Sequence, residues 1–213
     1  MAEAASKVWV LAGLPEALAE NLERRLTEAG HRVVSAARQT HDPGQAESWD
    51  HLFASADSSA GPADVLVLAL TAGTASPLED MALTQFRRDN EANLIGSFLG
   101  VQAAFKAFEG RGGRIVTLMS ANGREGLGAS PTLAAGSGGL AMLTRASALE
   151  GAGHRPHIHV NGVLTDSAAL WPAGDDAGSE VSLDEIAEAL IFLGGPGADY
   201  MTGSLVPVGA PGP

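Results

Sequence analysis

Ser120 is the residue of this chain whose type and position first indicate chemistry. It closes the apolar run in GRIVTLMSANG, and a serine at the end of a buried strand can act as a nucleophile when a base takes its proton. Arg124 and Glu125 follow in the same loop and could serve as an acid–base pair, although charged residues at a loop tip are more often only solvated. Because no base is assigned beside it, Ser120 alone is not an activated nucleophile.

The histidines of HRPHIH, at residues 154–159, are candidate metal ligands. His157 and His159 are two positions apart, so a strand would place both on one face. They lie at the start of that strand, whereas ligands of parallel α/β sheets bind at the carboxyl ends. No carboxylate cluster accompanies them and the chain has no cysteine, so we predict no metal site.

The loop that follows Thr165 is acidic and contains one large aromatic residue. Its carboxylates, Asp166, Asp175 and Asp176, are interpreted as solvated. Trp171 could fill a pocket or dock on a partner, and the sequence does not separate the two.

Buried strands and amphipathic helices must position these residues. Apolar runs predict strands at Val8–Leu11, Arg32–Ala36, Asp64–Leu70, Arg114–Leu118, Ile158–Leu164 and Ser204–Val208. Helical patterns lie between them at 15–29, 45–55, 83–108, 132–150 and 183–193. This alternation predicts an α/β, doubly wound, Rossmann-like parallel sheet of about six strands, with residues 1–213 as one domain. Any site then uses the loops at 12–16, 71–76, 119–131 and 165–181.

Composition excludes several classes of partner. The net charge is −12, with Lys7 and Lys106 as the only lysines, which argues against nucleic acids and anionic membranes. The N-terminal MAEAASK has no basic region of a signal peptide, and VWVLAGL is too short to span a bilayer. We expect a cytoplasmic protein.

Six segments, in this order, resemble the short-chain dehydrogenase/reductase family. They are AGLPEALA, DVLVLALTAG, NLIGSFLGVQAAF, GRIVTLMSANG, HVNGVLTD and IAEALIFLGGPGADYMTGSLVPVGA. They are similar to the family's glycine-rich turn, its NNAG strand, its long interface helix, its serine strand, its VNxxxPG segment and its C-terminus. The resemblance spans nearly the whole chain and implies the fold deduced above.

The resemblance also implies which residues would be catalytic. Asn93 and Ser120 occupy the family's Asn and Ser positions, but Leu133 and Ser137 stand where the family has the Tyr and Lys of its YxxxK helix. In the family, the Tyr exchanges a proton with the substrate, and the Lys lowers the tyrosine pKa and holds the nicotinamide ribose. The chain's only tyrosine is Tyr200, so a shifted alignment restores nothing. The resemblance therefore indicates a catalytically inactive member.

The cofactor-binding segments also depart from the family pattern. In the dinucleotide turn only Gly13 remains, while Ala17 and Ala19 replace the later glycines and Pro15 lacks an N–H. The segment from Val33 to Asp64 is shorter than the family's, so one helix and one strand near the adenine pocket are expected to be missing. Thr165 and Asp166 replace the family's Pro-Gly, and the following loop is too short for its usual substrate lid. We predict no cofactor in this chain.

Helices 83–108 and 132–150 correspond to the family's four-helix subunit interface. The first is apolar on much of its circumference, and small residues in the second could allow close approach of another helix; they are Ala134, Ala135, Gly136, Gly138 and Gly139. The leading hypothesis is a non-catalytic subunit of a hetero-oligomeric dehydrogenase, bound to an intact partner that carries NAD or NADP and performs alcohol or hydroxyacyl oxidation or keto reduction. Two alternatives stay open: a homo-oligomeric protein that binds or responds to a small ligand, and a nicotinamide-independent enzyme that uses Ser120.

Overall fold

The fold is built on one parallel sheet of six strands, as the sequence predicted. The computed structural model describes residues 6–36, 41–69, 73–126, 128, 130–167, 170 and 181–209, without the side chains of Asn122 and Glu125. The strand order is β2-β1-β3-β4-β5-β6, and every pairing is parallel. The strands are β1 (Val8–Ala12), β2 (Arg32–Ser35), β3 (Val65–Ala69), β4 (Gly113–Ser120), β5 (Ile158–Thr165) and β6 (Leu205–Pro207). The central strands β1 and β3 are buried along their whole length, which explains their continuous apolar sequence.

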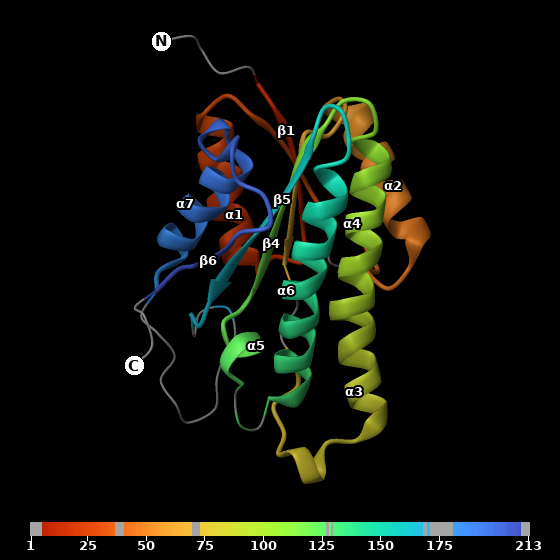
Figure 1. The fold of residues 1–213 in the computed structure, drawn as a ribbon, viewed down its shortest axis with the longest axis vertical. Helices are drawn as coiled ribbons and strands as arrows, with labels where there is room; N and C mark the ends of the chain where they lie inside the picture. The colour runs from red at the N-terminus through yellow and green to blue at the C-terminus, as the bar shows by residue number, and fades with distance from the viewer. Residues whose placement is uncertain are drawn as a thin grey trace.

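Helices cover both faces of the sheet, and short helical turns join some of them (Figure 1). One face carries α1 (Glu16–Glu28) and α7 (Leu183–Gly194), and the other carries α2 (Ala46–Ser59), α4 (Gly96–Ala107) and α6 (Pro131–Gly151). The remaining helical segments are η1 (Leu78–Asp80), α3 (Leu83–Asn90), η2 (Glu91–Ile95), α5 (Asn122–Glu125) and η3 (Pro196–Ala198). None of the helices described is both long enough and apolar enough to cross a bilayer.

The long helix predicted at 83–108 is interrupted by a π-helical turn. It runs as α3, then η2, then α4, and ends at Ala107. A π-turn inserts one residue into the helical repeat and rotates the side chains around it, and such turns are frequent at functional sites. Hydrophobic periodicity does not reveal this insertion, because the residues on both sides of it are equally helical.

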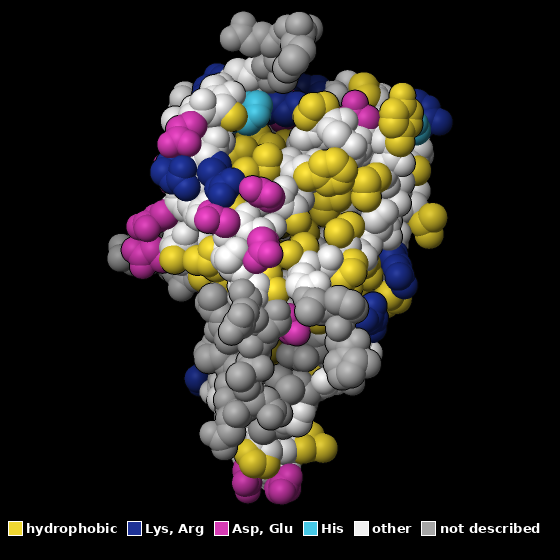
Figure 2. Space-filling model, turned by 90° about the vertical axis from the view of Figure 1, so that its left-hand side faces the viewer, with side chains coloured by type: hydrophobic (Ala, Val, Ile, Leu, Met, Phe, Trp, Pro, Cys, Tyr) yellow, Lys and Arg dark blue, Asp and Glu magenta, His cyan; other side chains and the backbone are white. Residues whose placement is uncertain are grey.

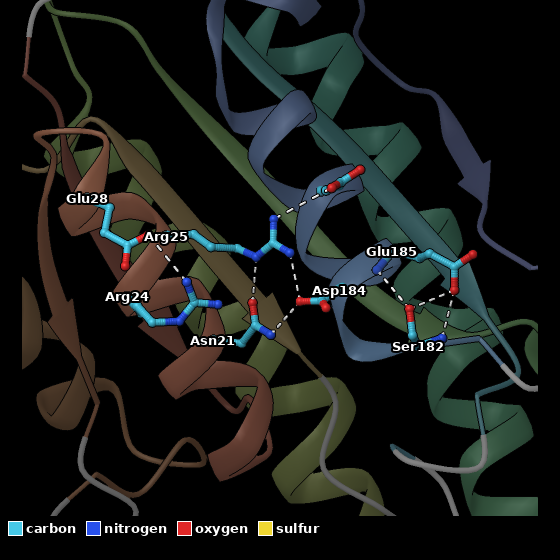
Figure 3. A network of polar contacts seen from close by, with 8 residues as sticks. Asn21, Arg24, Arg25, Glu28, Ser182, Asp184 and Glu185 are labelled. Carbon is cyan, nitrogen blue, oxygen red and sulfur yellow. Dashed lines mark hydrogen bonds and ion pairs between the residues drawn. The ribbon is translucent and has the colours of Figure 1, made fainter.

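Polar contacts join the two helices on the α1–α7 face (Figure 3). The Arg25 guanidinium donates to Asp184 Oδ1 at 2.7 Å and to Asn21 Oδ1 at 2.8 Å, and the Asn21 amide donates to the same Asp184 oxygen. Ser182 begins α7 with the predicted capping box, in which its hydroxyl accepts the Glu185 N–H while the Glu185 carboxylate accepts the Ser182 N–H. On the face of the molecule that Figure 2 shows, acidic and basic side chains gather beside a group of hydrophobic side chains.

The structure agrees with the shortened segment that the sequence predicted. One helix, α2, connects β2 to β3, and β2 is the outer strand on that side of the described sheet. Trp49 of α2 is fully buried against α4, where a Cβ added to Gly100 would lie 2.7 Å from its ring. The Trp49 indole N–H donates to the carbonyl of Pro43 at 2.9 Å. This packing holds α2 against the sheet at its edge.

The glycines of α6 have close neighbours within this chain, and their predicted contact with a second subunit stays a prediction. A Cβ added to Gly136 would lie 3.4 Å from Asn93 Cβ, one on Gly138 would lie 3.2 Å from the Gly123 carbonyl, and one on Gly139 would lie 2.8 Å from Leu94. Of the three, only Gly139 leaves no room for a Cβ, because Leu94 of η2 lies against it. At Gly136 an added Cβ would make ordinary van der Waals contact.

Candidate functional site

Ser120 lies at the carboxyl end of β4, in register with Thr165 at the end of β5. It is fully buried, and its backbone N–H donates to the Ser137 hydroxyl at 3.3 Å. Ser137 is itself fully buried on α6. Ser137, which the sequence predicts in the family's lysine position, therefore supports the end of β4.

Asn93 lies in the π-turn η2 and is buried against α6 beside Gly136. Its carbonyl accepts a hydrogen bond from the Ser97 hydroxyl in the next helical turn. Since Gly136 precedes Ser137, the Asn93, Ser120 and Ser137 positions converge on one stretch of α6. Their neighbour Leu133 is one turn earlier in the same helix.

Leu133 is a core residue, with 6% of its surface exposed. It belongs to the hydrophobic cluster that also contains Val163, Leu170 and Val181 and the buried leucines of α1. The preceding Thr132 is also buried, and its hydroxyl makes no hydrogen bond within the part of the chain that the structure describes. At the position where the sequence predicts the family's tyrosine, an apolar side chain packs into the interior.

Tyr200 lies far from these positions in the fold. It is fully exposed and precedes β6, so it lies at the amino edge of the sheet, opposite the carboxyl edge that holds Ser120. The chain's only tyrosine therefore cannot take the place of the residue that Leu133 replaces.

The structure describes some of the loop residues that the sequence singled out, and others lie outside the described residues. Arg124 is exposed in α5, and the Glu125 side chain lies outside the described residues, so the acid–base pair is not tested. Asp166 is half-buried after β5, while Trp171, Asp175 and Asp176 lie outside the described residues. Their predicted roles stay predictions.

His157, directly before β5, and His159, within it, lie at the amino edge of the sheet. Their ring centroids are 6.1 Å apart, and His159 Nδ1 lies 3.2 Å from the Met201 carbonyl, while His157 Nδ1 lies 3.0 Å from an Arg155 nitrogen. Within the described residues no group of three histidine, aspartate or glutamate side chains could hold a metal ion.

The turn after β1 retains its first glycine for a steric reason. Gly13 has a φ of 72°, and a Cβ there would lie 2.2 Å from the Ala69 carbonyl oxygen of β3. Beyond it, Pro15 is the N-cap of α1, Glu16 places a carboxylate in the first turn, and Ala17 is exposed. A pyrophosphate at this helix would meet a residue with no N–H and a negative side chain. These residues fit a dinucleotide pyrophosphate poorly.

A cavity of about 240 Å³ lies at the carboxyl ends of β1 and β3, and no pattern in the sequence indicates it. His41, in the loop before α2, contributes to its wall. Burial lowers the pKa of His41, with hydrogen bonding to Ser48 opposing the shift, so the neutral imidazole is favoured. No periodic pattern marks His41, which explains why the sequence did not reveal it.

The fold and the convergence of these positions define a Rossmann-like α/β protein with its site at the carboxyl edge. The family model described as short chain dehydrogenase matches residues 1–168. The chain therefore belongs to the short-chain dehydrogenase/reductase family of oxidoreductases, as its motifs indicated.

Two curated relatives come from Sinomonas cyclohexanicum. Trans-4-hydroxycyclohexanecarboxylate dehydrogenase is 30% identical over 74% of this chain and 63% of its own length. Cis-4-hydroxycyclohexanecarboxylate dehydrogenase is 29% identical over 89% of this chain and 80% of its own length. The chain thus spans under two thirds of the first relative.

Solved structures of the family share the fold. A short chain dehydrogenase from Mycobacterium smegmatis superimposes with a TM-score of 0.79 at 23% identity, covering 98% of this chain and 93% of that one. The 3-ketoacyl-(acyl-carrier-protein) reductase from Brucella melitensis, complexed with NADH, gives a TM-score of 0.81 at 21% identity, over 95% of this chain and 96% of that one. At these identities the likeness concerns the fold alone.

Proposed function

We propose that this chain is a non-catalytic subunit of a hetero-oligomeric short-chain dehydrogenase, whose intact partner binds NAD(P) and performs the hydride transfer. One observation carries the proposal: Leu133 is buried in the core and Ser137 is bonded to Ser120, at the two positions where the family places its Tyr and Lys.

Neither replacement can perform the chemistry of the residue it replaces. A leucine has no proton to exchange with a substrate oxygen, and proton transfer of this kind contributes about 10²–10⁴ to the rate. The Ser137 hydroxyl carries no positive charge and is engaged with the backbone of β4. Tyr200 lies at the opposite edge of the sheet, so no other residue supplies the missing phenol.

The turn after β1 also supports the proposal that the partner chain binds the dinucleotide. NAD or NADP would be held by the partner chain, because Pro15 and Glu16 leave this chain's α1 poorly suited to a pyrophosphate. When bound in the partner, the nicotinamide supplies or accepts the hydride.

The faces of α4 and α6 support a subunit interface. Phe98 is 47% exposed and Leu149 is 81% exposed, and Met142 is also exposed between them in sequence. A shallow groove between the two helices is lined by apolar side chains that include Phe98, Phe105 and Leu143. Exposed apolar surface of this kind marks interaction sites, and the family's own subunit contacts use these helices.

The relatives indicate which chemistry the partner should be assayed for first. Two of them are named as hydroxycyclohexanecarboxylate dehydrogenases, so oxidation of a cyclic hydroxy acid is the first assay for the complex.

Native mass spectrometry of the tagged chain, isolated from its own cells, tests the proposal. The expected species contains this chain and a second short-chain dehydrogenase whose peptides include an intact YxxxK. Phe98→Glu on α4 should release that partner, while Phe192→Glu, an equally exposed phenylalanine on α7, should retain it. A homo-oligomer alone, or NAD(P)-dependent oxidation by the pure chain, would refute the proposal.

An enzyme that uses Ser120 without nicotinamide has less support. Ser120 is fully buried in this structure, whereas a nucleophilic hydroxyl must be reached by its substrate. An activity of the pure chain that Ser120→Ala abolishes would establish this alternative, and an unchanged rate would end it.

A further inference from the structure

β2 is the outer strand of the sheet, and among the strands that the structure describes it pairs with β1 alone. The hydrogen bonds at its two ends show which peptide groups face β1. The Arg32 and Ala36 N–H groups both donate to carbonyl oxygens on the β1 side, at 2.9 and 2.8 Å. In a parallel ladder, alternate residues of a strand bond to the same neighbour. The N–H and C=O groups of Val33 and Ser35 therefore point away from β1, toward the outer edge of the sheet.

The outer edge of β2 is accessible and lacks the usual protection of an edge strand. Proteins protect such edges with lysines, prolines or bulges. The sequence of β2 is RVVS, in uninterrupted register with β1, and its one charged residue, Arg32, stands at its start. Ser35 is exposed, and Val33 and Val34 are only half-buried. An edge of this kind pairs readily with another strand.

The space beside β2 on the α2 side is open. A groove lies there between the strand and the helix, and none of the residues that line it is a lysine, arginine, aspartate or glutamate. Its lining includes Val34, Ser35 and Ala36 from the strand side and His51, Leu52 and Ser55 from the helix. Helix α2 thus leaves room for a neighbouring strand, and no charged side chain of the groove would be desolvated when that strand approaches.

We propose that a second copy of this chain pairs with this edge, β2 against β2, antiparallel about a two-fold axis at Val34. Such an axis places Val33 of one protomer opposite Ser35 of its partner. These are the two residues whose peptide groups point outward, and an antiparallel hydrogen-bonded pair exchanges two N–H···O=C bonds. The outward hydrogen-bonding pattern of β2 is therefore complementary to itself, which is the condition for a closed two-fold contact.

The side chains along the ladder are compatible with this pairing. The two Val34 side chains meet at the axis, on the face where Val34 already packs against the cluster that contains Leu52. Arg32 of one protomer lies opposite Ala36 of its partner, so the two arginines are about 13 Å apart along the strands at a rise of about 3.4 Å per residue. This separation exceeds the Debye length of about 8 Å at physiological ionic strength, so their repulsion is screened.

Introduced cysteines test the register, because the chain has none of its own. The two Val34 Cα atoms would lie about 4.5 Å apart, as in a non-hydrogen-bonded pair, and a disulfide spans about 4.4–6.8 Å. Val34→Cys should therefore form a linked dimer on mild oxidation, seen in non-reducing electrophoresis. The two Ser35 Cα atoms would lie about 8–9 Å apart, beyond disulfide reach. Ser35→Cys is thus the matched control and should not become linked, although Ser35 is the more exposed residue.

Val33→Pro tests the hydrogen bonds of the contact. It removes an N–H that points away from β1, so the fold should be retained, as circular dichroism can check. In sedimentation equilibrium the dissociation constant of the dimer should rise at least tenfold, because each protomer loses a donor and leaves an acceptor of its partner unpaired. This comparison decides the question even if Val34→Cys does not fold.

Phe98→Glu separates this contact from the α4–α6 interface proposed above. Phe98 lies on α4, so its replacement should leave both the Val34→Cys linkage and the dissociation constant unchanged. The β2 contact therefore does not depend on the partner subunit, and either proposal can fail alone. A chain that stays monomeric at all concentrations, equal linking of Val34→Cys and Ser35→Cys, or a dimer that Phe98→Glu disrupts and Val33→Pro preserves would overturn the proposal.

Discussion

Gly136→Ala should stabilise the protein, although it changes a buried glycine in the helix of the candidate site. The glycine lies inside α6, where its conformational freedom in the unfolded chain disfavours folding by about 0.5–1 kcal/mol relative to alanine. An added Cβ finds only Asn93 Cβ nearby, at 3.4 Å, which is ordinary van der Waals contact. We expect a gain of about 1 kcal/mol, equivalent to about 2–4 °C in Tm for a chain of this size.

Denaturant unfolding and calorimetry of the purified variants measure this gain. Gly151→Ala is the matched control in the same helix, because its Cβ would lie 2.2 Å from the Ile158 carbonyl oxygen. It should lose about 1–3 kcal/mol. Gly136→Ala should also leave the oligomeric state unchanged in light scattering, since the Gly136 contact is intramolecular. A lower Tm for Gly136→Ala, or loss of an assembly, would refute the packing argument and restore the glycine to an interface.

Three further predictions concern stability. Gly100→Ala places a Cβ 2.7 Å from the ring of Trp49, so it should lower the free energy of unfolding by about 1–3 kcal/mol, measured by urea unfolding. A urea midpoint equal to that of the unaltered protein would show that α2 packs differently. Ser182→Ala removes the capping box of α7 and should lose about 1 kcal/mol by the same assay, an expectation that an unchanged midpoint would contradict. Burial lowers the pKa of both His31 and His41, with the charge of Lys7 adding to the effect at His31. Below a pH of about 6.5 the unfolded chain therefore binds more protons than the folded chain, so the free energy of unfolding should decrease as the pH falls. A variant with both His31→Asn and His41→Asn should lose this pH dependence. If the pH dependence is unaltered, other groups cause it.

The strands and most helix boundaries could be predicted because they depend on local patterns. The six apolar runs appear as six strands, and the capping box at Ser182 begins α7 where the sequence placed it. The helix before β3 was predicted at 45–55 but continues to Ser59, because polar residues near its end hide the helical period. Element identity follows from the spacing of apolar residues, whereas an element's end depends on contacts that the spacing does not contain.

In the candidate site, too, the positions of residues along the chain could be predicted, but the contacts between distant segments could not. The order of motifs along the chain predicts that Asn93, Ser120, Leu133 and Ser137 correspond to the family's four positions, and this stays a prediction. The hydrogen bond between Ser137 and the Ser120 N–H could not be predicted, since it joins two segments through their packing.

The sequence by itself determined the fold class and the family, since both depend on residue identity and local order. Only the tertiary structure decided what the small residues of α6 contact and where a cavity forms. The glycines face η2 and the α5 turn of the same chain. His41 and Trp49 contact each other edge to face and line a cavity at three strand ends. Close approach and enclosed volume depend on how distant segments pack together, and no local pattern of side chains encodes that distance.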